Sequence, residues 1–356
     1  MSSFLVIILS VLLFSFLIFI HELGHFLAAK WSGVRVNEFS MFMGPAIFKK
    51  QKGETLYSIR CIPIGGYCAM EGEDGDSEDP RSFASAAWWK RLIILVAGSF
   101  MNMVAGILIM LLVFLPTKSV VVPEIAQFES YSTLSGADGL QVGDKFVSID
   151  GERIYLQSDF SLILQLNEGD VHDLVVERNG QQVKLDDFVM EKHTIEENGV
   201  EKKMYGIHFR EVETDLAMKL KIGWYNCLDS MRLVRLSLGM LLSGEAGVKD
   251  MSGPLGIVDQ MVQVADVSET AMDAFLNILY FGGFIAINLA MMNMLPIPAL
   301  DGGRVVALLI TAGVERIIGR KLNPKYEAVI HGVGMVLLLA LMAFILFKDA
   351  FMIFKR

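Results

Sequence analysis

The sequence opens with a long stretch from Phe4 to Ala29 that is largely apolar but carries His21, Glu22 and His25 near its end. As a helix this stretch rises about 39 Å, which is enough to cross a bilayer core about 30 Å thick. His21 then lies about 26 Å along the helix, still inside the membrane. A central ionisable side chain costs roughly 2.5–3.5 kcal/mol in such a helix. Three of them within five residues therefore predict a compensating partner.

The spacing of the two histidines predicts what that partner is. His21 and His25 lie one turn apart on one helical face, so two imidazoles can share one metal ion. Glu22 lies beside such an ion without having to ligate it, where it can act as a general base toward water. The alternative is a structural polar cluster, but the flanking phenylalanines, leucines and isoleucines leave no solvated face. We therefore predict a metal site that a residue further along the chain completes.

The composition limits the class of protein. Of 356 residues 53% are hydrophobic and the mean hydropathy is +0.48, which is too apolar for a soluble globular protein. The net charge of −9 argues against nucleic acid as a partner. The three cysteines form no Cys-x-x-Cys pair and are interpreted as small buried hydrophobes. The N-terminus lacks the basic residues of a cleavable signal peptide, so the first apolar stretch is expected to remain as a span.

Three more apolar segments, at about 88–115, 275–295 and 330–347, bring the expected number of transmembrane helices to four. Basic residues are frequent between the first and second spans and absent before the first. The positive-inside rule then puts the N-terminus outside the cell and the metal site toward the cytoplasmic side. We expect a multi-pass protein of a cell membrane.

The segments between the spans differ in kind. Residues 55–70 alternate like a strand and carry turn signals at Pro63 and Gly65-Gly66. We therefore expect an apolar hairpin that dips back toward the metal site. The alternative is an interfacial hairpin that does not contact the site. Residues 120–212 predict one small extracellular β-rich domain, with hairpin turns at Asp150-Gly151 and Asn179-Gly180. Residues 216–243 are apolar but charged, which favours an amphipathic interfacial helix.

The third span ends in Asn293-Met-Leu-Pro296-Ile-Pro298-Ala-Leu-Asp301-Gly-Gly. The alternation of spans across the membrane brings Asp301 to the depth and side of His21 and His25. Two histidines, one carboxylate and an open position are typical of a catalytic zinc site. The two prolines interrupt the helix and free backbone groups that can hydrogen-bond an extended peptide. The alternatives are that the prolines simply end the helix and that Asp301 is a helix N-cap.

The second span carries Gly98, Asn102 and Gly106 at four-residue spacing. Small residues at that spacing allow another helix to approach, and Asn102 can hydrogen-bond across the contact. Helix packing is therefore the role that the sequence favours for all three.

Together, His21-Glu22-Leu23-Gly24-His25 and Asn293-x-x-Pro296-x-Pro298-x-Leu300-Asp301-Gly302 resemble the site-2 protease family of intramembrane zinc metalloproteases, and more narrowly its bacterial regulator-of-sigma-E type. Further segments are similar to family elements: Ile62–Tyr67 to the membrane re-entrant β-loop, Gly98-x-x-x-Asn102 to the second-span motif, Ala137–Asp144 with Ile149–Gly151 to the PDZ domain, and Ser252–Ile257 to the segment after it. The chain departs from the enterobacterial member in having room for one PDZ domain, and in having Phe42-Met43-Gly44 in place of Gly-Phe-Gly.

The resemblance implies a polytopic α-helical membrane protein with about four transmembrane helices, a membrane re-entrant β-hairpin and one inserted extracytoplasmic PDZ-like β-rich domain. The implied domains are an N-terminal membrane half (1–119), the PDZ-like domain (120–212), an amphipathic interfacial segment (213–274) and a C-terminal membrane half (275–356). The implied location is a bacterial inner membrane.

The resemblance also implies one catalytic Zn²⁺ on His21, His25 and Asp301, with Glu22 as the general base. The implied substrate-binding residues are Asn293, Pro296, Pro298, Gly65, Gly66 and Tyr67. The implied partners are the lipid bilayer and single-pass membrane proteins, such as anti-sigma factors after a first cut or signal-peptide remnants.

Two other classes of function are open to such a sequence. A metal-ion transporter also uses intramembrane His, Glu and Asp, but the sequence offers one metal constellation and an external β-domain that transport does not need. Metal flux that does not depend on Glu22 would favour the transporter. An inactive scaffold for membrane partners is the other alternative, and the intact Glu22 argues against it.

Overall fold

The computed structural model describes residues 2–355 except 74–76, 137, 168, 198–199, 248–250 and 319–324, so Ala137 of the PDZ-like motif lies outside the described residues. The chain forms two compact units. Residues 1–113 and 230–356 make the membrane unit, and residues 114–229 make the inserted unit.

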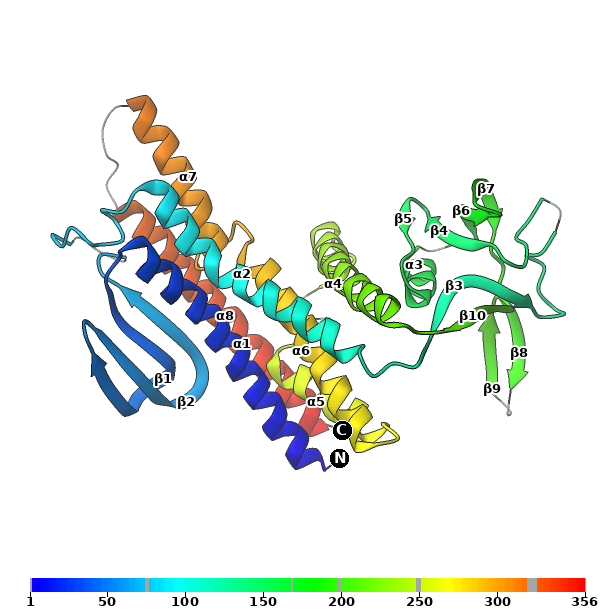
Figure 1. Cartoon of the computed structure of the whole chain (residues 1–356), viewed down its shortest axis with the longest axis horizontal. Coiled ribbons are helices and arrows are strands. Elements are labelled where there is room, and N and C mark those ends of the chain that lie inside the picture. Colours follow the sequence, from blue (N-terminus) through cyan, green and yellow to red (C-terminus); the bar gives the residue numbers. More distant parts are fainter. Residues whose placement is uncertain are drawn as a thin grey trace. The chain divides into compact units, whose positions relative to one another are not determined.

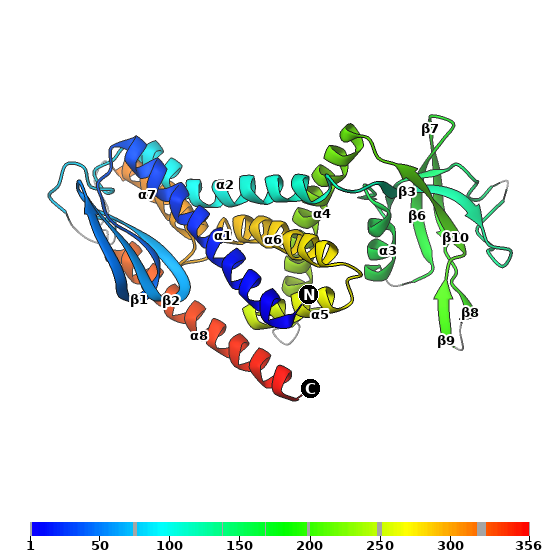
Figure 2. The same ribbon diagram turned by 60° about the horizontal axis from the view of Figure 1, so that its bottom comes forward.

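Helices dominate the membrane unit (Figure 1). The described residues contain four helical segments long and apolar enough to span a membrane, as the sequence predicts: Ser3–Ser32 (α1), Trp88–Val113 (α2), Ala271–Asn293 (α6) and Val329–Met352 within α8 (Lys325–Lys355). α1, α2 and α6 pack against one another, and the two views of the ribbon agree on this (Figures 1 and 2). Leu17, Ile278 and Ile285 are among the buried residues of this helical core.

A long β-hairpin lies between α1 and α2 in the sequence and packs against α1. It consists of β1 (Val36–Lys52) and β2 (Thr55–Met70), joined by a turn at Gly53-Glu54. The turn expected at Pro63 and Gly65-Gly66 is confirmed by the register, because residues 38–41 pair with both 56–59 and 66–69 and the chain must reverse between these two parts of β2; Gly65 has a φ of 75° there. On either side of the reversal, the ladder pairs Ile62 with Met43 and Gly66 with Met41. Pro63 therefore lies in a bend of β2 that returns the chain to β1.

Three further helices complete this part of the chain: α4 (Leu216–Ser243), which runs from the inserted unit into the membrane unit, α5 (Pro254–Asp266) and α7 (Asp301–Ile318). α5 is held by α8, because Oδ2 of the buried Asp349 accepts hydrogen bonds from the N–H groups of Gly253 and Gly256, both at 2.9 Å. A carboxylate at that position satisfies the first free N–H groups of the helix and complements its dipole. A Cβ on Gly253 would lie 2.8 Å from the same oxygen, which explains the glycine before Pro254.

The inserted unit is built around a sheet with the strand order β10-β3-β4-β6-β7, with the short β5 paired to β4. Its elements are β3 (Ser119–Phe128), β4 (Lys145–Ile149), β5 (Glu152–Arg153), α3 (Gln157–Leu166), β6 (Val171–Arg178), β7 (Gln181–Val189), β8 (His193–Glu197), β9 (Val200–Met204) and β10 (Ile207–Glu213). Both predicted hairpin turns are confirmed: Ile149 pairs with Glu152 around Asp150-Gly151, and Arg178 pairs with Gln181 around Asn179-Gly180. All four turn residues have positive φ, as type I′ turns require. Phe146, Leu174 and Phe160 lie in the core between the sheet and α3.

Candidate metal centre

α1 carries the two histidines toward the same point in the membrane unit. Because the residues are four apart on one helix, their imidazoles meet, and the Nε2 atoms of His21 and His25 are 3.2 Å apart. Both residues lie in the part of α1 that faces α2, and His25 is buried.

The close approach of α1 and α2 rests on a glycine in each helix. A Cβ on Gly24 would lie 2.4 Å from the carbonyl oxygen of Ala97, so only glycine fits there. A Cβ on Gly98 would lie 2.3 Å from His25 Nε2 and 2.8 Å from His21 Cε1. The backbone of α2 therefore lies directly against the two imidazoles, and this gives Gly98 a second role besides helix packing.

Asp301, the first residue of α7, reaches the same point from the other end of the sequence. Its Oδ2 atom is 3.2 Å from His21 Nε2 and 3.4 Å from His25 Nε2. The irregular segment after α6 places it there, and the following glycines permit the tight fold. A Cβ on Gly302 would lie 2.3 Å from the Met294 carbonyl, and one on Gly303 would lie 2.2 Å from the Ile297 carbonyl oxygen.

These three atoms have the spacing of ligands around one zinc ion. The three distances between them are 3.2, 3.2 and 3.4 Å. The edge of a tetrahedron is about 1.63 times its centre-to-corner length, so zinc bonds of about 2.0–2.1 Å predict about 3.3–3.4 Å between ligands. Asp301 Oδ2 is buried, yet no described group hydrogen-bonds it with suitable geometry. A carboxylate oxygen and two imidazole nitrogens in this arrangement are a donor set that fits Zn²⁺.

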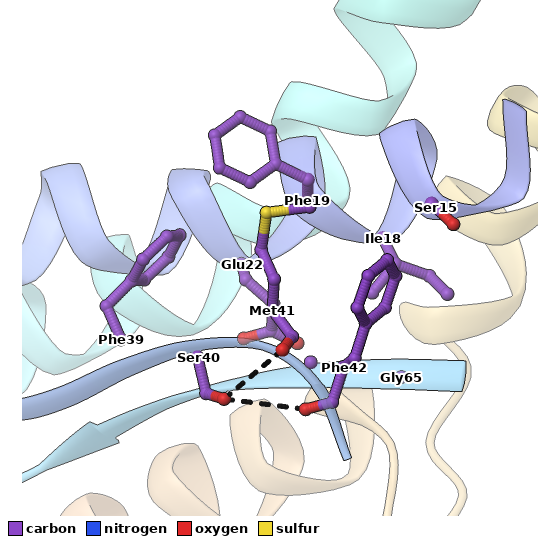
Figure 3. Close-up of a pocket in the computed structure, with 10 residues that line it drawn as sticks. Ser15, Ile18, Phe19, Glu22, Phe39, Ser40, Met41, Phe42 and Gly65 are labelled. Carbon is purple, nitrogen blue, oxygen red and sulfur yellow. Dashed lines mark hydrogen bonds between the residues drawn. The ribbon is translucent and has the colours of Figure 1, made fainter. Parts of the chain in front are cut away.

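Glu22 lies beside this cluster, at a narrow slot between α1 and the β-hairpin (Figure 3). The walls come from the α1 residues Ser15, Ile18, Phe19 and Glu22, and from the hairpin residues Phe39, Ser40, Met41, Phe42, Gly65 and Gly66. β2 passes close to Glu22 at Gly66, because a Cβ there would lie 3.3 Å from Glu22 Cγ. Strand backbone therefore runs past the glutamate that is the candidate base.

The structure places the other candidate binding residues in two groups. Gly65 and Gly66 line the slot beside Glu22. The neighbouring Tyr67 ring stacks on the guanidinium group of Arg60, with the Arg60 Cζ atom 5.2 Å from its centroid. Asn293 ends α6, whereas Pro296 and Pro298 lie in the irregular segment that leads to Asp301.

Sequence reasoning missed one residue that supports this segment. His331 of α8 accepts a hydrogen bond at its Nδ1 atom from the N–H of Ala299, at 3.2 Å. Ala299 has a φ of 81°, which L-residues adopt at a cost of roughly 1–2 kcal/mol, so the segment before Asp301 needs such support. One turn later, a Cβ on Gly334 would lie 2.5 Å from Pro298 Cβ. In the sequence, the only sign of this supporting role is that His331 is a lone histidine in an apolar helix.

Comparison with known proteins assigns the family. The model of peptidase family M50 matches residues 9–341. A zinc metalloprotease of Clostridium acetobutylicum is 33% identical over 350 residues, which cover 98% of each chain. The zinc metalloprotease RasP of Oceanobacillus iheyensis is 28% identical over 426 positions, with 95% of this chain and 97% of that protein covered. The regulator of sigma-W protease RasP of Bacillus subtilis is 26% identical over 428 positions, with 96% and 97% covered. With its intramembrane cluster of two histidines and an aspartate, the chain belongs to peptidase family M50, the site-2 proteases, and is an intramembrane zinc metalloprotease.

Proposed function

We propose that His21, His25 and Asp301 hold the zinc ion, and that Glu22 is the general base for hydrolysis of peptide bonds within or near the transmembrane segment of single-pass membrane proteins. The observation that carries this proposal is the ligand triangle, with sides of 3.2–3.4 Å, one residue from a glutamate that lines a slot. When bound, zinc supplies a Lewis acid that polarises the scissile carbonyl and lowers the pKa of water. Glu22 accepts the proton of the attacking water and delivers it to the leaving amine.

The slot suits an extended peptide better than a helix. The strand backbone at Gly65-Gly66 forms one wall of the slot. A substrate segment that unwinds there gains main-chain hydrogen bonds in place of those of its helix. In this proposal the hairpin re-enters the membrane, Gly65, Gly66 and Tyr67 guide the segment, and Asn293, Pro296 and Pro298 contact it from the other side.

The substrate class and the orientation complete the proposal. A relative over nearly the whole chain is named a regulator of sigma-W protease, which supports an anti-sigma-factor-like substrate after a first extracytoplasmic cut, with signal-peptide remnants as a second class. The basic residues from the last turn of α1 through β1, among them Lys30, Arg35 and Lys49, support a cytoplasmic position for that end of α1. The N-terminus and the inserted unit, as a PDZ-like domain, are then outside the cell.

Replacement of Glu22 by Gln tests the role of the general base separately from that of the zinc ligands. We expect Glu22→Gln to bind about one zinc per chain and to lose cleavage of a single-pass substrate by roughly 10²–10⁴-fold. Zinc content after dialysis and cleavage by purified protein measure the two properties. The matched variant Asp301→Ala should lose both zinc and activity, because two histidines alone bind zinc weakly. Near wild-type turnover by Glu22→Gln would contradict the proposed mechanism.

A further inference from the structure

Each candidate zinc-binding histidine presents its Nε2 atom to Asp301, which leaves its Nδ1 atom to the surrounding protein. A neutral imidazole binds a metal through one nitrogen only if the other nitrogen carries the proton. What accepts that proton therefore fixes both the tautomer and the orientation of the ring.

For His25 the acceptor is on α2. Its Nδ1 atom lies 2.8 Å from the carbonyl oxygen of Ile94, and a carbonyl can only accept. His25 is thereby held with Nε2 unprotonated and directed at the ligand cluster.

For His21 the contact is again on α2, through the Asn102 side chain. The Asn102 amide nitrogen lies 3.4 Å from His21 Nδ1, while the amide oxygen is buried and has no hydrogen-bond partner among the described residues. Asn102 itself is 1% exposed, so solvent does not reach it readily. A buried polar atom without a partner costs about 1–3 kcal/mol.

A different assignment of the two amide atoms gives His21 Nδ1 an acceptor. The oxygen and nitrogen of a side-chain amide have nearly the same shape, and their assignment follows from the hydrogen bonds that they make. With the amide turned by 180°, the oxygen faces His21 Nδ1 and accepts its proton. The oxygen then has a partner, the amide nitrogen takes its former place, and His21 takes the same tautomer as His25.

We propose that Asn102 is a positioning residue for zinc, whose side-chain oxygen accepts the Nδ1–H of His21 and so presents His21 Nε2 to the metal. This inference rests on the proposed ligand set and adds a residue to it. It also gives Asn102 a role different from the helix packing that its sequence spacing favours. α2 thus supports both histidines, one through a main-chain carbonyl and one through a side chain.

Zinc affinity of the full-length protein in detergent, measured by competition with a chromogenic chelator, tests the proposal without relying on cleavage. We expect Asn102→Leu, which has a similar volume but no acceptor, to weaken zinc binding about 10–100-fold. Asn102→Asp keeps an acceptor oxygen and should stay within about threefold of the wild type. If Asn102→Leu does not yield folded protein, Asn102→Ala takes its place with the same expectation.

The order of the variants separates positioning from packing. If Asn102 only packed helices, a buried carboxylate would be worse than leucine, so weaker zinc binding by Asn102→Asp than by Asn102→Leu would overturn the proposal, as would wild-type affinity in Asn102→Leu. Ser99→Ala is the matched control, because it removes another buried side-chain oxygen from α2 and should leave zinc affinity unchanged. A separate result would refute the ligand set itself: His21→Ala would bind zinc as tightly as the wild type.

Discussion

At the scale of single residues, the candidate metal centre depends on positions without a side chain as much as on the proposed ligands. Gly24, Gly98, Gly302 and Gly303 each occupy a position where a Cβ would overlap a neighbour at 2.4 Å or less. Three of these neighbours are backbone atoms, but the neighbour of Gly98 is His25 Nε2, a proposed zinc ligand. An added methyl group at Gly98 therefore acts on the metal site directly.

We expect Gly98→Ala to displace the imidazoles and to lower the zinc content well below one ion per chain. Overpacking of this kind also costs roughly 1–3 kcal/mol of stability. Gly106→Ala is the matched control on the same helix, because a Cβ there would meet Ile287 Cγ1 at 2.7 Å rather than a histidine. Metal analysis of both purified variants measures the difference. Stoichiometric zinc in Gly98→Ala would mean that the histidines lie elsewhere.

At the scale of elements, the hairpin turn of β4 and β5 is tied to β6 through one carboxylate. Asp150 accepts hydrogen bonds from the His172 ring at 2.7 Å, the Asn167 amide at 2.7 Å and the Asp173 N–H at 2.9 Å. Burial favours the neutral acid, but these hydrogen bonds outweigh it, so the pKa of Asp150 lies below its ordinary value. The stabilisation is complete above the unfolded-state pKa of about 4 and is lost as the pH falls through the lower folded-state pKa.

Asp150→Asn keeps a residue that tolerates the left-handed turn but removes the charge. At pH 7 we expect it to destabilise β4 and β6 by about 1 kcal/mol, and the difference from the wild type should shrink as the pH falls below about 4. Hydrogen exchange of peptides from residues 145–178 in the full-length protein, corrected for intrinsic rates, measures this. Asp187→Asn is the control, since Asp187 has the same φ of 51° but its carboxylate is not among the partners of Asp150. A difference that persisted unchanged at pH 3 would contradict the assignment.

The same elements show how far the sequence predicts this structure. The Asp-Gly and Asn-Gly turns are local signals, so both hairpins of the sheet were predictable. The turn at Pro63 and Gly65-Gly66 was predictable for the same reason, but β1 was not, because the pairing of residues 38–41 with both 56–59 and 66–69 joins segments that no local pattern connects. Asp301 was predictable as a partner of His21 because the membrane restricts depth and the order of spans fixes the side. The contacts of His331 and of the Asn102 amide could not be predicted, because they depend on which faces of the helices pack together. Hydropathy does not determine this.

At the scale of the whole molecule, the inserted unit is connected to the membrane unit at both of its ends. Its part between residues 120 and 212, about 90 residues long, has as a compact domain a radius of gyration near 12 Å, comparable to the width of a small helical bundle. If the unit lies on the outer face, as the proposed topology requires, it obstructs substrates that still carry a bulky folded ectodomain. A first cut is then needed for steric reasons, without specific recognition of the new terminus.

Replacement of residues 120–212 by a short flexible linker tests this role. We expect the linker variant to cleave an untrimmed single-pass substrate that the wild type rejects, while cleavage of the trimmed substrate changes little. Glu22→Gln in the linker background excludes contaminating proteases. Continued rejection of the untrimmed substrate, with normal cleavage of the trimmed one, would show that the inserted unit is not a steric gate.

The division of the ligand set between α1 and α7 also affects how the protein is made. Ribosomes deliver His21 and His25 to the membrane first, and the whole of the inserted unit is synthesised before Asp301 emerges. Two imidazoles without the carboxylate do not retain zinc firmly. With the proposed ligand set, a nascent chain therefore lacks hydrolytic power until Asp301 has been synthesised. The position of this ligand late in the sequence delays activity until most of the membrane unit is in place.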